Sequence, residues 1–294
     1  MSNFVTIQRK IKRFNKKIEI SGDKSISIRW VLISSISTGV SRAKNLLMSE
    51  DVLAAINAVK KFGIKVRNKK NIVEITGKGI NGYKYKKNIL INAQNSGTLS
   101  RLLLGLMINS PYPIKLIGDK SLSKRDFKRV ADPLTRFGAK INLNKNKFLP
   151  LTICGSQNLR PIKYFEKRGS AQCKSAVIFG GIRTLGETII KAKKSRNHTE
   201  LLCQHLKLPL TIKSKKEHDI IKIKNIKNIK KLNYEIPSDI SSSAFFIALT
   251  ALNKDSYNVK LCAEKNWSIV ISNFCSQEIV ENHIENYLKY SNLS

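Results

Sequence analysis

Apolar positions with helical spacing recur three times along the chain at a nearly constant interval. The apolar stretches predict buried helices over residues 26–36, 99–108 and 174–182. Each stretch opens on a short polar motif, and the motifs begin 73 and then 74 residues apart: Gly22-Asp23-Lys24-Ser25, Asn95-Ser96-Gly97-Thr98 and Gly169-Ser170-Ala171-Gln172. A short strand-like run follows each helix, at residues 42–47, 113–117 and 187–191. This regularity indicates an internal repeat.

The second half of each repeat predicts strand pairs. In the first two repeats a second helix ends in Phe62-Gly63 and Phe137-Gly138, where the glycine is typical of a helix C-terminus. The predicted strand pairs are residues 64–66 with 72–75, 140–143 with 149–153, and 210–212 with 220–223. The unit is therefore helix–strand–helix–strand–strand, three times over. A fourth copy starts at 237–243, continues into an apolar helix at 244–249, and stops before its second half.

Composition narrows the class of protein. A hydrophobic content of 41% supplies enough material for cores and excludes global disorder. No run approaches the ~18–20 apolar residues of a membrane span, and basic residues interrupt the first fourteen positions, so we expect no membrane segment and no signal peptide. Five scattered cysteines favour reduced thiols, a cytoplasmic location and no zinc site.

The net charge of +34 has two interpretations. Lysine outnumbers arginine 41 to 13, and Ile and Asn are also abundant, as an AT-rich coding sequence would produce. A nucleic-acid binder is the alternative, but the lysines are dispersed and no nucleic-acid-binding motif accompanies them, so we favour the compositional interpretation. The first 260 residues carry a balance of +36 and the remainder −2, which marks a break near residue 261.

The repeated helix starts suggest an anion site. Helix N-termini attract anions through their free N–H groups and partial positive charge. Charged or amide side chains lie at or near each start: Lys24, Ser25 and Arg29, then Arg101, then Gln172 and Lys174. A Ser or Thr at one helix start is most often an ordinary N-cap. Three such starts at a constant period favour a shared site for an anionic small molecule.

These motifs resemble the EPSP synthase (3-phosphoshikimate 1-carboxyvinyltransferase) family, of bacterial type. The resemblance rests on six ordered motifs: SGDKSISIR at 21–29, NSGTLSR at 95–101, GDKSLSKR at 118–125, SAQCKSA at 170–176, SRNHTE at 195–200 and PSDISSSAFF at 237–246. It implies an α/β fold of the inverse α/β barrel-like kind, with three βαβαββ units per domain. The implied domains are an N-terminal strand segment at 1–20 belonging to the second domain, a first domain at 21–236, the start of the second domain at 237–261, and a divergent tail at 262–294.

The resemblance also implies the reaction and the site. The family transfers the enolpyruvyl group of phosphoenolpyruvate to the 5-hydroxyl of shikimate 3-phosphate and releases phosphate, without metal or organic cofactor. The residues implied to bind shikimate 3-phosphate are Lys24, Ser25, Arg29, Ser170, Ala171, Gln172 and Ser195. Those implied to bind phosphoenolpyruvate are Lys24, Gly97, Arg125 and Gln172. We expect a monomer with these two small anions as its partners.

The sequence also departs from the family. Asp126 replaces the proline that follows the clamping arginine, and Ile28 replaces a histidine. We expect Asp126 to weaken the hold of Arg125 on an anion. We find no counterpart of the family's catalytic Asp, and we therefore expect this chain alone to bind shikimate 3-phosphate weakly and to turn over little. The alternatives are a non-catalytic binding fragment and a UDP-sugar enolpyruvyltransferase relative.

Overall fold

The computed structural model describes residues 16–245, 258–262 and 268–272. The chain divides into two compact units, one made of Met1–Ser21 with Pro237–Ser294 and the other of Gly22–Ile236. We call the second unit the body. Among the residues that the structure describes, no helix is both long and apolar enough to cross a membrane.

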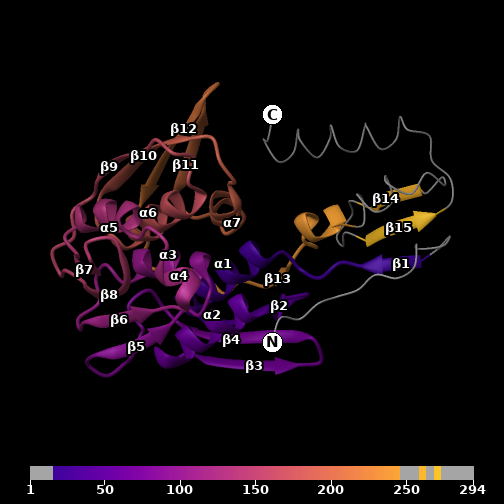
Figure 1. Ribbon diagram of the computed structural model, residues 1–294, viewed down its shortest axis with the longest axis horizontal. Coiled ribbons are helices and arrows are strands. Elements are labelled where there is room, and N and C mark those ends of the chain that lie inside the picture. The colour runs from indigo at the N-terminus through magenta and orange to yellow at the C-terminus, as the bar shows by residue number, and fades with distance from the viewer. Residues whose placement is uncertain (1–15, 246–257, 263–267, 273–294) are drawn as a thin grey trace. The chain divides into compact units, whose positions relative to one another are not determined.

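The order helix–strand–helix–strand–strand occurs three times in the body, with one additional short helix, α4, in the second repeat, which confirms the predicted repeat (Figure 1). The first repeat contains α1 (Lys24–Ser35), β2 (Thr38–Lys44), α2 (Glu50–Lys61), β3 (Lys65–Lys69) and β4 (Ile72–Lys78). The second contains β5 (Ile89–Asn92), α3 (Gly97–Leu106), β6 (Ile114–Ile117), α4 (Lys120–Ser123), α5 (Lys128–Thr135), β7 (Lys140–Asn144) and β8 (Phe148–Cys154). The third contains β9 (Lys163–Glu166), α6 (Ala171–Arg183), β10 (Glu187–Lys193), α7 (His198–His205), β11 (Leu210–Ser214) and β12 (His218–Lys224).

Each repeat contributes one four-stranded sheet of the same topology. The strand orders are β13-β2-β4-β3, β5-β6-β8-β7 and β9-β10-β12-β11. In every sheet the first pair is parallel and the other two are antiparallel. Strand β13 (Tyr234–Glu235) lies at the C-terminal end of the body and pairs with β2 of the first repeat, with Tyr234 opposite Ala43. The first repeat therefore takes its first strand from the other end of the body.

The first helices of the repeats form the centre of the body and are buried on nearly all sides. Figure 1 shows α1, α3 and α6 lying between the sheets. Their apolar residues, such as Leu32, Leu103 and Val177, are at most 1% exposed. The helices approach closely at Gly105, where an added Cβ would lie 2.1 Å from the backbone oxygen of Ala176. Small residues thus set the spacing between α3 and α6.

Local sequence signals account for the ends of these helices. The Asp23 carboxylate accepts a hydrogen bond from the backbone N–H of Ile26 at 2.7 Å, and the Ser96 hydroxyl accepts one from Leu99 at 3.3 Å. The glycines after the second helices adopt positive φ, +80° at Gly63 and +116° at Gly138, as the Phe-Gly pairs predicted. The ends of these helices are therefore set by capping residues and glycines that can be recognised in the sequence.

The other unit is described only in part. Strand β1 (Lys16–Glu19) pairs antiparallel with β15 (Ser268–Ser272), which pairs antiparallel with β14 (Asn258–Cys262). The backbone N–H of Asp239 donates to the oxygen of Ser21 at 2.9 Å. The predicted apolar helix at 244–249 lies outside the described residues from position 246 onward, as does most of the tail after residue 262.

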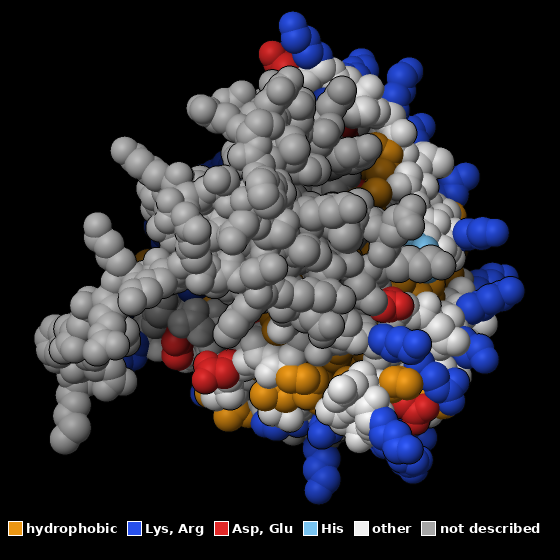
Figure 2. Space-filling model, turned by 90° about the vertical axis from the view of Figure 1, so that its right-hand side faces the viewer, with side chains coloured by type: hydrophobic (Ala, Val, Ile, Leu, Met, Phe, Trp, Pro, Cys, Tyr) orange, Lys and Arg blue, Asp and Glu red, His pale blue; other side chains and the backbone are white. Residues whose placement is uncertain are grey.

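Basic side chains occur along the whole described part of the face shown in Figure 2, from top to bottom, between white, orange and red side chains. On this face they follow the described surface without forming a single basic groove, which agrees with the compositional interpretation of the charge. In the described ranges, the cysteines Cys154, Cys173 and Cys203 are free, and no cluster of metal-ligating side chains occurs.

Candidate functional site

The start of α3 lies between two guanidinium groups. Gly97 is the first residue of α3, and a Cβ added there would lie 2.9 Å from Nη1 of Arg101 and 2.9 Å from Nη1 of Arg125. The Asn95 side chain orients Arg125 by accepting a hydrogen bond from its Nη2 at 2.8 Å. Because glycine has no side chain, a ligand can approach both cations and the helix N-terminus together.

A third arginine adds to this positive charge. We call Arg101, Arg125 and Arg129 the guanidinium cluster. Burial lowers the pKa of Arg101 to about 10, and the charges of Arg129 and Arg125 act in the same direction. Arg101 still carries its proton at neutral pH. The Nε atoms of Arg101 and Arg129 are buried without a hydrogen-bond partner among the described residues. In that same part of the chain no carboxylate forms an ion pair with the cluster, so an anionic ligand would supply the missing counter-charge.

Gln172 joins the start of α6 to the guanidinium cluster. Its Oε1 accepts a hydrogen bond from Nη1 of Arg101 at 2.7 Å, and its Nε2 donates to the Thr98 hydroxyl at 3.0 Å. Ser170 is the N-cap of α6, where its hydroxyl accepts from the backbone N–H of Cys173 at 3.3 Å. Ala171 is the first residue of α6. The structure therefore brings the predicted residues Gly97, Arg125 and Gln172 together around the starts of α3 and α6.

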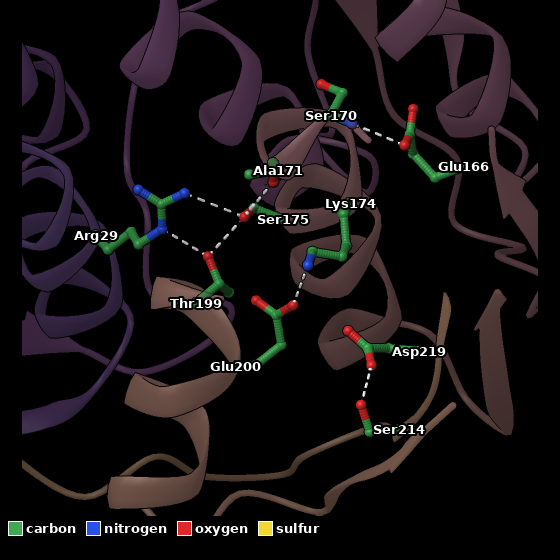
Figure 3. Close-up of polar contacts among 10 residues, drawn as sticks. All are labelled: Arg29, Glu166, Ser170, Ala171, Lys174, Ser175, Thr199, Glu200, Ser214 and Asp219. Carbon is green, nitrogen blue, oxygen red and sulfur yellow. Dashed lines mark hydrogen bonds and ion pairs between the residues drawn. The ribbon is translucent and has the colours of Figure 1, made fainter. Parts of the chain in front are cut away.

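Arg29 connects three helices of the body. Its Nε donates to the Thr199 hydroxyl of α7 at 2.6 Å and its Nη2 to the Ser175 hydroxyl of α6 at 3.2 Å (Figure 3). Its Nη1 donates to the backbone oxygen of Ser25 at 2.9 Å. Burial lowers the pKa of Arg29 to about 10, against the opposing effect of the Glu200 carboxylate. These contacts use three of the five N–H donors of the guanidinium and leave two for a ligand.

A buried ion pair lies directly behind this network. Lys174 Nζ is 2.6 Å from Oε1 of Glu200, and the two side chains are 0% and 2% exposed (Figure 3). The prediction that Lys174 adds a cation to the anion site is therefore wrong, because α6 turns this side chain into the core towards α7. Sequence reasoning also missed Ser175, Thr199 and Glu200, although all three lie inside the SAQCKSA and SRNHTE motifs.

Two predicted residues stand apart from these contacts. Lys24 is the first residue of α1, and its half-exposed side chain lies 3.1 Å from the Asp51 carboxylate of α2. Ser195 lies in the loop between β10 and α7, and its hydroxyl is buried without a hydrogen-bond partner among the described residues. Within that part of the chain, no hydrogen bond or ion pair links Lys24 or Ser195 to the guanidinium cluster.

The two departures from the family pattern have local structural roles. The Asp126 carboxylate accepts hydrogen bonds from the backbone N–H groups of Lys128 and Arg129 at 2.9 and 3.4 Å, at the start of α5. Its charge is thus directed at a helix N-terminus, where an acid is stabilising. Ile28 is fully buried in the hydrophobic core.

Comparisons with known proteins agree on one family. The profile of the family described as EPSP synthase (3-phosphoshikimate 1-carboxyvinyltransferase) matches residues 8–276. The 3-phosphoshikimate 1-carboxyvinyltransferase of Caldicellulosiruptor bescii is 40% identical over 246 residues, covering 82% of this chain and 55% of the relative. That of Streptococcus agalactiae is 38% identical over 242 residues, covering 82% of this chain and 56% of the relative.

A solved structure shows the same architecture. The EPSP synthase of Acinetobacter baumannii superposes with a TM-score of 0.73 at 32% sequence identity, over 82% of this chain and 54% of that protein. The inverse α/β barrel-like fold that the motifs implied is confirmed. The chain spans about half the length of the curated relatives it matches. On the profile match and these relatives, the chain belongs to the EPSP synthase (3-phosphoshikimate 1-carboxyvinyltransferase) family.

Proposed function

We propose that the body supplies one half of the substrate site of a 3-phosphoshikimate 1-carboxyvinyltransferase. The observation that carries this proposal is the approach of two guanidiniums, from Arg101 and Arg125, to the bare backbone of Gly97. Three neighbouring arginines without a carboxylate partner among the described residues suit a multiply charged anion, because guanidiniums bind phosphate and carboxylate in bidentate fashion. Phosphoenolpyruvate presents both groups.

The remaining predicted residues would hold the acceptor substrate. Shikimate 3-phosphate would bind against the starts of α1 and α6, near Lys24, Ser25, Ser170, Ala171 and Gln172. Arg29 would use its two remaining N–H donors, and Ser195 its unpartnered hydroxyl. In the reaction, the 5-hydroxyl gives up its proton as its oxygen adds to C2 of phosphoenolpyruvate, and C3 gains a proton to become a methyl group. Loss of phosphate from C2 and of one proton from C3 then gives 5-enolpyruvylshikimate 3-phosphate.

Three described carboxylates near the starts of α5, α6 and α7 make hydrogen bonds or an ion pair within the body. Glu166 accepts hydrogen bonds from the backbone N–H groups of Arg168 and Ser170, Asp126 binds the start of α5, and Glu200 pairs with Lys174. Each of these three carboxylates is engaged in contacts within the body, and the sequence offers no counterpart of the family's catalytic Asp. We therefore expect phosphate release by this chain to be slower, by about 10²–10⁴-fold, than by the Caldicellulosiruptor relative in a coupled assay. Equal rates would show that a base operates in this chain.

Binding of phosphoenolpyruvate tests the guanidinium cluster. With shikimate 3-phosphate present, Arg125→Met should weaken phosphoenolpyruvate binding by roughly 10–150-fold, the equivalent of one charge-assisted hydrogen bond of ~1.5–3 kcal/mol. Ligand-observed NMR on the full chain measures this change. The matched control is Arg67→Met, which removes an exposed arginine of β3 and should leave binding unchanged. Equal affinity of Arg125→Met and the unchanged chain would contradict the proposal, and so would preferential binding of a UDP-sugar over shikimate 3-phosphate.

Location is a separate proposal. We infer that the protein works in the cytoplasm, on the support of three free cysteines among the described residues.

A further inference from the structure

A cavity of about 330 Å³ lies at the other end of the central helices. The cavity is lined by the ends of two central helices, with Leu106 and Met107 from α3 and Arg183 from α6. The rest of the lining comes from residues that follow β4, α3 and β8: Asn81, Tyr83, Tyr85, Asn109, Ser110, Pro111 and Gln157. The guanidinium cluster surrounds the start of α3, and ten helical residues span ~15 Å. The cavity is therefore separate from the substrate site.

Arg183 is the charged group of this cavity. Its Nη2 donates to the Asn81 side-chain oxygen at 3.3 Å, but its Nε and Nη1 are buried without a hydrogen-bond partner among the described residues. No carboxylate in that part of the chain pairs with it. The negative end of α6 offsets some of its charge, because Arg183 lies in the last turn of the helix. The three N–H groups on these two nitrogens nevertheless remain without an acceptor, which is costly unless a ligand supplies one.

Two tyrosines also line the cavity. Tyr83 stacks on Phe62 with ring centroids 4.9 Å apart, and Tyr85 packs edge-on against Phe62 and Tyr112. The Tyr83 and Ser35 hydroxyls are hydrogen-bonded at 2.6 Å. These contacts hold both rings in fixed positions in the lining of the cavity.

The charge state of the lining favours an anion. Burial lowers the pKa of Arg183 to about 10 and raises that of Tyr83 to about 12. At neutral pH the arginine is therefore charged and the tyrosine is neutral. The cavity then holds one net positive charge beside neutral amides and hydroxyls.

We propose that this cavity binds a small carboxylate with a flat apolar body, the carboxylate against Arg183 and the body against Tyr83 and Tyr85. A guanidinium binds the two oxygens of a carboxylate either through Nε and Nη2 or through Nη1 and Nη2. Nη2 of Arg183 makes one hydrogen bond, to Asn81, so its second N–H can complete either pair with the unpartnered Nε or Nη1. The volume lies at the lower end of the ~300–1,000 Å³ range of small-molecule sites and limits the ligand to about the size of a substituted benzoate.

Benzoate and 3-phenylpropanoate are the probes, and the neutral isostere benzamide is the control ligand. In ¹⁵N-correlation NMR titrations of the full chain, we expect the carboxylates to shift resonances of the cavity residues and to bind at least tenfold more tightly than benzamide. Arg183→Met should weaken carboxylate binding by roughly 10–150-fold. Arg136→Met, an arginine whose Nη2 donates to the backbone oxygen of Lys163, should leave binding unchanged.

A second variant covers the case in which Arg183→Met does not fold. Asn81 is exposed at the edge of the cavity, so Asn81→Trp should block the cavity without disturbing the core and should abolish the shifts. The proposal would be overturned if benzoate and benzamide bound equally well, or if Arg183→Met and the unchanged chain bound benzoate equally well. It would also be overturned if 20 mM benzoate, roughly the dissociation constant of the weakest useful binding, shifted no cavity resonance. If the chain failed to bind phosphoenolpyruvate but still bound benzoate at this cavity, the proposed function would fail and the cavity proposal would stand.

Discussion

Replacing Lys174 with methionine is expected to lower the free energy of unfolding by about 3–5 kcal/mol. The substitution keeps most of the volume of the side chain but leaves the Glu200 carboxylate charged and 2% exposed, without its cation. A buried charge that loses its partner costs far more than the pair itself contributes, because the low-dielectric interior does not solvate it. Urea denaturation followed by circular dichroism measures the change.

A double variant separates the cost of the orphaned charge from the value of the pair. The second carboxylate oxygen of Glu200 has no hydrogen-bond partner within the described residues, so the pair is only partly satisfied. Lys174→Met combined with Glu200→Leu should therefore recover most of the lost stability. As a surface control, Lys128→Met removes an exposed i,i+4 pair with Asp132 and should cost less than about 1 kcal/mol. A double variant as unstable as Lys174→Met would refute this explanation.

Gly105→Ala is expected to destabilise the body by about 3 kcal/mol, at the upper end of the range for overpacking. The added methyl group would lie 2.1 Å from the backbone oxygen of Ala176, so α3 and α6 must move apart. A backbone atom cannot rotate away as a side chain can. The gain in helix propensity from glycine to alanine, about 1 kcal/mol, does not offset this cost.

Gly180→Ala is the matched comparison within α6. There the nearest neighbour of an added Cβ is a side chain, the ring of Phe137 at 3.0 Å, which needs to shift by only a few tenths of an ångström. The gain in helix propensity then nearly offsets the cost of this close contact, and we expect the free energy of unfolding to change by less than about 1 kcal/mol. Equal effects of the two substitutions in urea denaturation would mean that the α3–α6 spacing is not set by Gly105.

The sequence predicted the central helices and the strand pairs because their signals are local. Apolar spacing identified α1, α3 and α6, and the Phe-Gly pairs located the ends of two further helices. The periodicity missed β5 and β9, since each has only four residues and neither alternates between apolar and polar positions. It also missed β13, whose two residues become a strand only by pairing with β2.

The sequence motifs predicted which residues belong to the candidate site, but not how their side chains are arranged. The motifs named Gly97, Arg125 and Gln172, and the structure brings these three together. They could not show which cations remain available to a ligand. Lys174 and Gln172 are two positions apart on α6, so they project in different directions, one into the core and one towards Arg101. Only the placement of α7 and α3 decides this difference.

The pairing of β13 with β2 also has a consequence for folding during synthesis. Contacts that close the first sheet, such as the Asn45 side chain with the backbone oxygen of Ile236, join residues 191 positions apart. At ribosomal rates of ~5–20 residues per second, β13 is made roughly 10–40 s after β2. The second and third sheets can form from neighbouring segments in that interval. The first sheet, although made first, must wait with an unpaired edge, and nascent chains should be most vulnerable to proteolysis and aggregation at β2.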